Sequence, residues 1–163
     1  MIDRIVELSR GVPSAATAAW ALAGLRIFTG VIWLANLGWK LPPDFGRDET
    51  GGLMDNFEIA EQDAVFGFLR TFMREVVIPN YTLFGWLVFL VELAAGVLLT
   101  LGLLTRLGAL IGGIQALIIT LLVVQAPTEW FWTYAMLIAL HVVLFFTPCA
   151  ERLALDSGLR RRR

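Results

Sequence analysis

The chain has 163 residues, of which 58% are hydrophobic, and its formal net charge is −1. A soluble domain is about 45–50% apolar. Here the excess is gathered in long runs, so the composition is typical of a membrane protein. Because the net charge is close to zero, there is no electrostatic reason to expect nucleic-acid binding.

The cysteine and histidine content excludes several kinds of redox centre. The single cysteine, Cys149, cannot form an internal disulfide or a thiolate metal cage, and the single histidine, His141, cannot supply both axial ligands of a haem. No phosphate-binding glycine loop and no hydrolase or metalloprotease motif is present. We therefore expect no haem, metal or flavin to be held by this chain alone, and any enzymatic role to be that of a subunit.

The first long apolar run predicts a membrane helix over residues 18–41. Arg26 lies near its middle, Trp39 and Lys40 lie at its end, and Pro42-Pro43 stops it. Because the run is of full length and ends in Trp39-Lys40, we interpret it as a retained helix and not as a signal peptide.

Residues 44–81 are the only sizeable region outside the predicted membrane helices. Residues 44–63 are rich in glycine and acidic side chains, which predicts a loop with at most a turn of helix. In residues 64–78 apolar side chains recur at i, i+3 and i+4, which predicts an amphipathic helix of ~15 residues, too short to span. We expect it to lie in the membrane interface or to cap the bundle.

Three further apolar runs follow. Residues 83–104 and 107–125 are joined by Thr105-Arg106 and predict a transmembrane hairpin, and residues 130–147 predict a last membrane helix. Each hairpin run can cross a hydrocarbon core of ~30 Å at ~1.5 Å per residue. The sequence thus predicts an all-α integral membrane protein, a single domain over residues 1–163 built as a four-transmembrane-helix bundle.

The basic residues predict the orientation of this bundle. With both termini inside, the inner side carries eight basic residues, four of them in the terminal run 160–163, and the outer side carries four among nine acidic ones. Tryptophan and tyrosine gather at the predicted outer boundary. We therefore expect cytoplasmic termini, an extracytoplasmic amphipathic helix and a bacterial cytoplasmic membrane.

Each predicted membrane helix places one strongly polar side chain in the same thin layer. Arg26, Glu92, Gln115 and His141 all lie ~12–16 Å from the predicted inner face. Since such groups are costly against lipid, we expect them to point inward together, with Arg26 and Glu92 as an ion pair and the other two completing a network. This layer fits a ligand or proton site, and it equally fits a structural network that fixes helix register.

The pair Trp39-Lys40 at the outer boundary has two interpretations. It is either an anchor whose lysine reaches for the interface or part of a site for a lipid headgroup or a quinone.

Three segments together resemble a known family. They are LRIFTGVIWLANLGWKL in the first helix, VELAAGVLLTLGLLTRLGAL across the hairpin and ERLALD after the last helix. They resemble the DoxX/DoxD family of small four-helix bacterial membrane proteins, one branch of which is the small subunit of thiosulfate:quinone oxidoreductase. The residues that carry the resemblance are Arg26, Gly30, Gly38, Lys40, Glu92, Gly96, Gly102, Thr105, Arg106 and Asp156.

The resemblance implies a role beside a membrane redox system, with electrons passing from a prosthetic group on a partner subunit to a membrane quinone. Our first hypothesis is an integral subunit of a quinone-linked oxidoreductase. In it Arg26, Glu92 and His141 bind a quinone oxygen or relay its protons. Lys40, Trp39 and Gln115 complete the quinone site.

The main alternative is a non-catalytic accessory subunit that anchors or stabilises a larger membrane complex of membrane or soluble subunits. A third hypothesis, a small transporter, requires a homo-oligomer, because four helices without a repeat do not form two halves.

Overall fold

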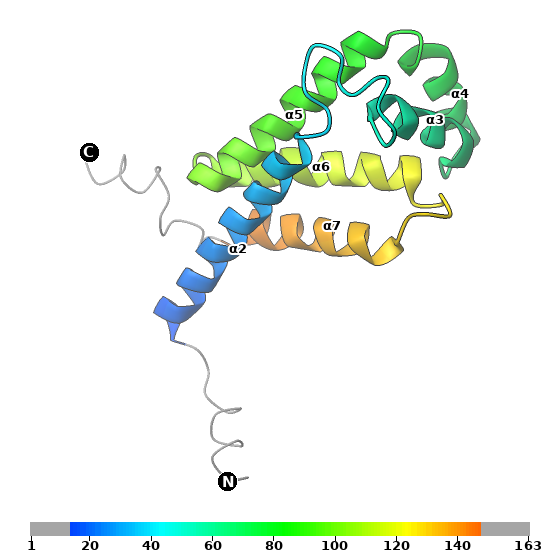
Figure 1. Ribbon diagram of the computed structural model, residues 1–163. Helices are drawn as coiled ribbons and strands as arrows, with labels where there is room; N and C mark the ends of the chain where they lie inside the picture. The colour runs from blue at the N-terminus through cyan, green and yellow to red at the C-terminus, as the bar shows by residue number, and fades with distance from the viewer. Residues whose placement is uncertain (1–13, 148–163) are drawn as a thin grey trace.

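The computed structural model describes residues 14–147, and within that range every regular element is helical (Figure 1). The elements in chain order are α2 (Ala15–Asn36), α3 (Leu53–Asp63), α4 (Gly67–Phe72), the π-helix η1 (Met73–Val77), α5 (Tyr81–Leu101), α6 (Thr105–Val123) and α7 (Phe131–Phe146). Cys149, Asp156 and the basic run 160–163 lie outside the described residues.

Three of these helices, α2, α5 and α6, are long and apolar enough to cross a membrane. The fourth, α7, is apolar but has only 16 residues, which corresponds to ~24 Å. The predicted membrane helices are therefore all present as helices, with α7 the shortest.

The first predicted helix is wrong at its end, because α2 stops at Asn36 and not at residue 41. Beyond it the backbone closes single turns, with the amide of Gly38 donating to Ala35 and that of Lys40 donating to Leu37. These turns carry Trp39 and Lys40 off the helix axis, so that Lys40 folds back toward the neighbouring α5.

The hairpin between α5 and α6 is tight, as predicted, although its turn lies at residues 102–104. Gly102 adopts a left-handed conformation with φ of 67°. The amide of Leu103 donates to the carbonyl of Leu98, which is the Schellman ending of a helix. Thr105 and Arg106 therefore belong to the first turn of α6 and not to the loop.

The helices form two packed pairs, α2 with α5 and α6 with α7, joined by this hairpin (Figure 1). At Gly30 the backbones of α2 and α5 touch, because an added Cβ would lie 2.4 Å from Thr100 Oγ1 and 2.9 Å from the carbonyl oxygen of Gly96. Small residues allow such close approach between membrane helices. From the hairpin, α5 and α6 diverge toward the opposite end of the bundle.

The opening between the diverging helices is covered by α3, α4 and η1, which we call the roof (Figure 1). The prediction of a loop over residues 44–63 is wrong, because α3 occupies its second half. Leu53, Phe57 and Ala60 form the buried face of α3. The sequence of α3 also contains four acidic residues, Asp55, Glu58, Glu61 and Asp63, and they obscured this helical spacing of one buried apolar side chain per turn.

The amphipathic helix predicted over 64–78 exists as α4 followed by η1. It caps the bundle, since Met73 and Val77 are buried in one cluster with Tyr81. Its other side remains apolar at the surface, where Phe66 and Phe68 stack with ring centroids 5.7 Å apart.

Candidate functional site

A buried ion pair joins the end of α2 to the middle of α5. The amine of Lys40 lies 2.7 Å from Glu92 Oε2 and 2.8 Å from Oε1, and both side chains are almost fully enclosed. The amide of Asn36 donates to Glu92 Oε2 at 3.3 Å and accepts from the Trp39 indole at 3.0 Å. A carboxylate held by two neighbours in a buried site is costly to disturb on one side alone.

The surroundings of Lys40 are only partly favourable to its charge. Burial lowers the pKa of the amine from its ordinary value, and the Glu92 carboxylate opposes this shift. The amine also lies 4.2 Å from the centroid of the Trp39 ring, a cation–π contact. Lys40 is thus a partner of Glu92, whereas the anchor interpretation placed it at the interface.

The predicted pair of Arg26 with Glu92 is wrong. Arg26 instead donates to the backbone carbonyls of Leu99 at 2.5 Å and Thr100 at 3.3 Å. These carbonyls belong to the last turn of α5, where the helix dipole makes a positive charge favourable. Leu99 lies seven residues beyond Glu92, which is ~10 Å along the helix.

His141 is bound on both sides of its ring. Its Nε2 accepts from the Trp33 indole at 2.9 Å, and its Nδ1 lies 2.7 Å from the carbonyl of Leu137. An indole nitrogen can only donate, so Nε2 is the acceptor and Nδ1 carries the proton. An added Cβ at Gly112 would lie 2.3 Å from Nε2, so this glycine makes room for the Trp33–His141 contact.

The prediction of a single polar layer is therefore wrong. The polar contacts lie at three depths in the bundle, each made by a different residue of the segment 26–40. Arg26, Trp33 and Lys40 follow each other at seven-residue intervals. They bind, in turn, the end of α5, His141 on α7 and Glu92 on α5. The depths of the four predicted residues agreed by count alone, but the helices are inclined to one another. Gln115 does reach the Glu92 carboxylate with a side-chain hydrogen bond, whereas Arg26 and His141 have the other partners described above.

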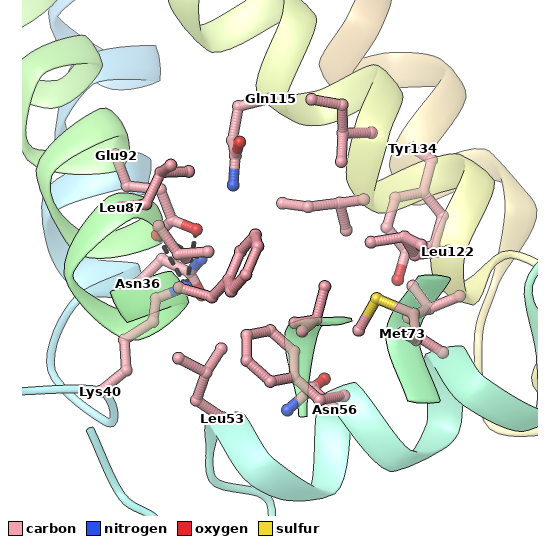
Figure 2. A pocket seen from close by; sticks show the side chains of 18 of the residues that line it. Asn36, Lys40, Leu53, Asn56, Met73, Leu87, Glu92, Gln115, Leu122 and Tyr134 are labelled. Atoms are coloured by element: carbon pink, nitrogen blue, oxygen red, sulfur yellow. Dashed lines mark hydrogen bonds and ion pairs between the residues drawn. The ribbon is translucent and has the colours of Figure 1, made fainter. Parts of the chain in front are cut away.

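A cavity of about 540 Å³ lies between the two helix pairs, beneath the roof (Figure 2). Lys40, Glu92 and Asn36 lie on its wall from α2 and α5, and Gln115 points into it from α6. The facing wall and the roof are mainly apolar, with Leu53, Phe57, Leu69, Met73, Val77, Ile119, Leu122, Val123 and Leu137 among the lining residues.

Four of the six predicted site residues line this cavity: Glu92, Lys40, Trp39 and Gln115. Arg26 and His141 do not. Asn36 and the roof residues are additional lining residues that the sequence did not single out. Asn36 carried a usable signal, since it is a polar side chain four residues before Lys40 at the end of an apolar helix. The lining residues of α3 carried none, because their region was expected to be a loop, whereas those of α4 and η1 belong to the helix that was predicted over residues 64–78.

The cavity has the character of a small-molecule site. Sites of this kind have volumes of roughly 300–1,000 Å³, apolar walls and a few polar groups that fix orientation. Here Lys40, Asn36 and Glu92 form one polar wall, and Gln115 adds an amide from α6. Asn56 of α3 and Thr133 and Tyr134 of α7 are the further polar lining residues. This arrangement suits a flat, largely apolar molecule that carries hydrogen-bond acceptors.

A comparison with protein families identifies one match. The family model described as "TQO small subunit DoxD" matches residues 60–163. The matched part contains Glu92 and Gln115, whereas α2 and Lys40 precede it. No curated protein matches significantly, and no solved structure does. Together with the three apolar helices, the match identifies a multi-pass membrane protein, and the chain belongs to the DoxD family.

Proposed function

We propose that this protein is the membrane subunit of a quinone-linked oxidoreductase and that its cavity binds the quinone headgroup. The observation that carries the proposal is the Lys40–Glu92 pair, which places a donor and a carboxylate on one wall of a mainly apolar cavity. The family assignment supports the same function, since the name of the family denotes a small subunit of a quinone-reducing enzyme.

The residues present fit a quinone. A quinone ring is flat and apolar and its two carbonyl oxygens only accept hydrogen bonds, so the site needs donors. Lys40 has three N–H donors, and the amides of Gln115 and Asn36 each have two. A bound quinone would take up two electrons, supplied by a prosthetic group on a partner subunit, and two protons.

This chain's own residues have two tasks in such a site. Lys40 and Gln115 orient the ring by donating to its oxygens, and they favour the negative charge that develops there during reduction. The Glu92 carboxylate is a proton acceptor next to the Lys40 amine. The pair can therefore pass a proton to a quinone oxygen that it contacts. Trp39 excludes water from the amine by covering it.

The membrane arrangement belongs to the same proposal. All four long helices, including α7, cross a bacterial cytoplasmic membrane, with the hairpin end and both termini on the cytoplasmic side. The roof then lies on the outer side, which carries fewer basic residues than the inner side, as the positive-inside rule expects. Partner subunits complete the enzyme.

The test is turnover of the intact complex with Glu92→Gln. This change keeps the size of the side chain and removes its charge, so we expect the rate of quinone reduction per complex to fall at least about tenfold, which corresponds to ~1.4 kcal/mol. Glu75→Gln is the matched control, because the same change there affects an exposed side chain of η1. Equal turnover in both variants would refute the proposal.

A second function, that of an accessory subunit without chemistry, is favoured by a separate observation. The hydrogen bond from Arg26 to Leu99 and that from Trp33 to His141 each run from helix to helix and stabilise the bundle itself. In that case Glu92→Gln lowers the yield of the complex or detaches its partners, while turnover per intact complex stays at the wild-type value.

A further inference from the structure

Besides Thr133 at the start of α7, three apolar residues that line the cavity are exposed. They are Leu87 on α5, Ile118 on α6 and Phe72 on α4, with exposed fractions of 52%, 45% and 44%. A lining residue with half its surface accessible lies where a cavity opens. The cavity therefore reaches the outside of the bundle between α5 and α6, below α4.

The surface around this opening is apolar. Leu83, Leu87 and Leu90 form an exposed stripe at helical spacing on α5, and Ile114, Leu117 and Ile118 form another on α6. A helix stripe of aliphatic side chains on a membrane helix faces hydrocarbon and not water. The opening consequently interrupts a lipid-facing surface.

The rim nearest the membrane surface is aromatic. Phe72 packs edge-on against Phe84 of α5, with ring centroids 6.1 Å apart. Phe66 and Phe68 continue the exposed apolar side of α4, whereas Met73 and Val77 of the following η1 point inward. An amphipathic helix with this division lies in the interface, its apolar side in the acyl chains.

We propose that the cavity opens sideways into the bilayer between Leu87 and Ile118, beneath Phe72, and that its ligand is an amphiphile whose head lies at Lys40 and Glu92 and whose apolar tail leaves through this opening. The identity of the head rests on the proposed function. The new elements are the tail, the route by which the ligand enters and the residues that frame it.

The distribution of polar residues in the cavity supports this orientation of the ligand, with its head inside and its tail at the opening. Lys40, Glu92 and Asn36 are on the wall from α2 and α5, while the exposed residues at the opening are Leu87, Ile118 and Phe72. A head with hydrogen-bond acceptors gains partners at this wall and at Gln115 beside it, and an alkyl or isoprenoid tail loses no hydrogen bond in passing the aliphatic rim. A ligand entering from water would have to cross the roof.

The test uses bulky substitutions at the rim and matched ones beside it. Leu87→Trp and Ile118→Trp narrow the opening. Leu90→Trp and Leu117→Trp are the controls, since Leu90 and Leu117 are exposed on the same two helices and do not line the cavity. The protein, reconstituted with its partners in lipid nanodiscs, is loaded with a decyl-tailed benzoquinone, and the rate of loading is measured.

We expect the two rim variants to load several-fold more slowly than the wild type and the two controls to load at the wild-type rate. A decyl-tailed benzoquinone with a photoreactive group at the end of its tail should crosslink to the segments around Leu87 and Ile118. Equal loading in rim and control variants, or crosslinks confined to α7 or to the loop 37–52, would overturn the lateral opening while leaving the quinone site standing. If the wild type takes up no quinone at all, both proposals fail.

Discussion

The buried polar side chains have different surroundings at the two ends of the bundle. At the hairpin end the helices touch, and Arg26 and His141 are bound to a helix terminus and to an indole. At the roof end the helices diverge, and Lys40, Glu92 and Gln115 line a cavity. A charged residue inside a membrane bundle is therefore a poor guide to function by itself. The space beside it distinguishes a structural contact from a candidate site.

The largest effect should come from removing one member of the ion pair. Lys40→Met leaves Glu92 buried without its cation, and we expect the free energy of unfolding to fall by about 3–5 kcal/mol. Thermal unfolding of the purified protein measures this loss. The double variant Lys40→Met/Glu92→Leu should recover most of the stability, because the uncompensated charge is gone. A double variant as unstable as the single one would contradict this account of the pair.

The close contact at the hairpin end should come next. Gly30→Ala places a methyl group against backbone atoms of Gly96 and Thr100 that cannot rotate away, so we expect a loss of about 3 kcal/mol in the free energy of unfolding. Gly24→Ala is the control on the same helix, since nothing lies within 4 Å of an added Cβ there. Similar melting temperatures in the two variants would show that the helices do not meet at Gly30.

The Trp33–His141 contact should have a smaller effect, confined to stability. His141→Phe leaves the buried Trp33 indole without its acceptor, and we expect a cost of about 1–3 kcal/mol in the free energy of unfolding. Because His141 does not line the cavity, retention of quinone by the folded variant should equal that of the wild type. Loss of quinone from a well-folded His141→Phe variant would indicate that the quinone site lies nearer the hairpin end than we propose.

Much of this fold could be predicted from the sequence because the membrane restricts it so strongly. Apolar run length, the prolines and the short link at Thr105 located the long helices and the hairpin. The roof was missed in part, because the buried positions of α3 are only Leu53, Phe57 and Ala60 among many acidic residues. The local composition therefore predicted a loop, although burial of these three side chains against the rest of the fold stabilises a helix.

The sequence predicted several residues of the candidate site, but it did not predict which of them contact one another. Counting residues along each helix gave similar depths for Arg26 and Glu92, but it could not give the rotation and tilt of α2 against α5. It also could not show that α2 ends at Asn36, and this ending is what lets Lys40 turn back to Glu92. One helix boundary thus changed the partner of the central carboxylate.

The most direct test of the division between the two ends is an inventory of retained quinone. Mass spectrometry of the gently extracted complex would count quinone per subunit in the wild type, in Glu92→Gln and in His141→Phe. The account predicts that quinone stays with the wild type and His141→Phe and is lost from an otherwise intact Glu92→Gln complex. Quinone retained by Glu92→Gln, or absent from the wild type, would contradict it.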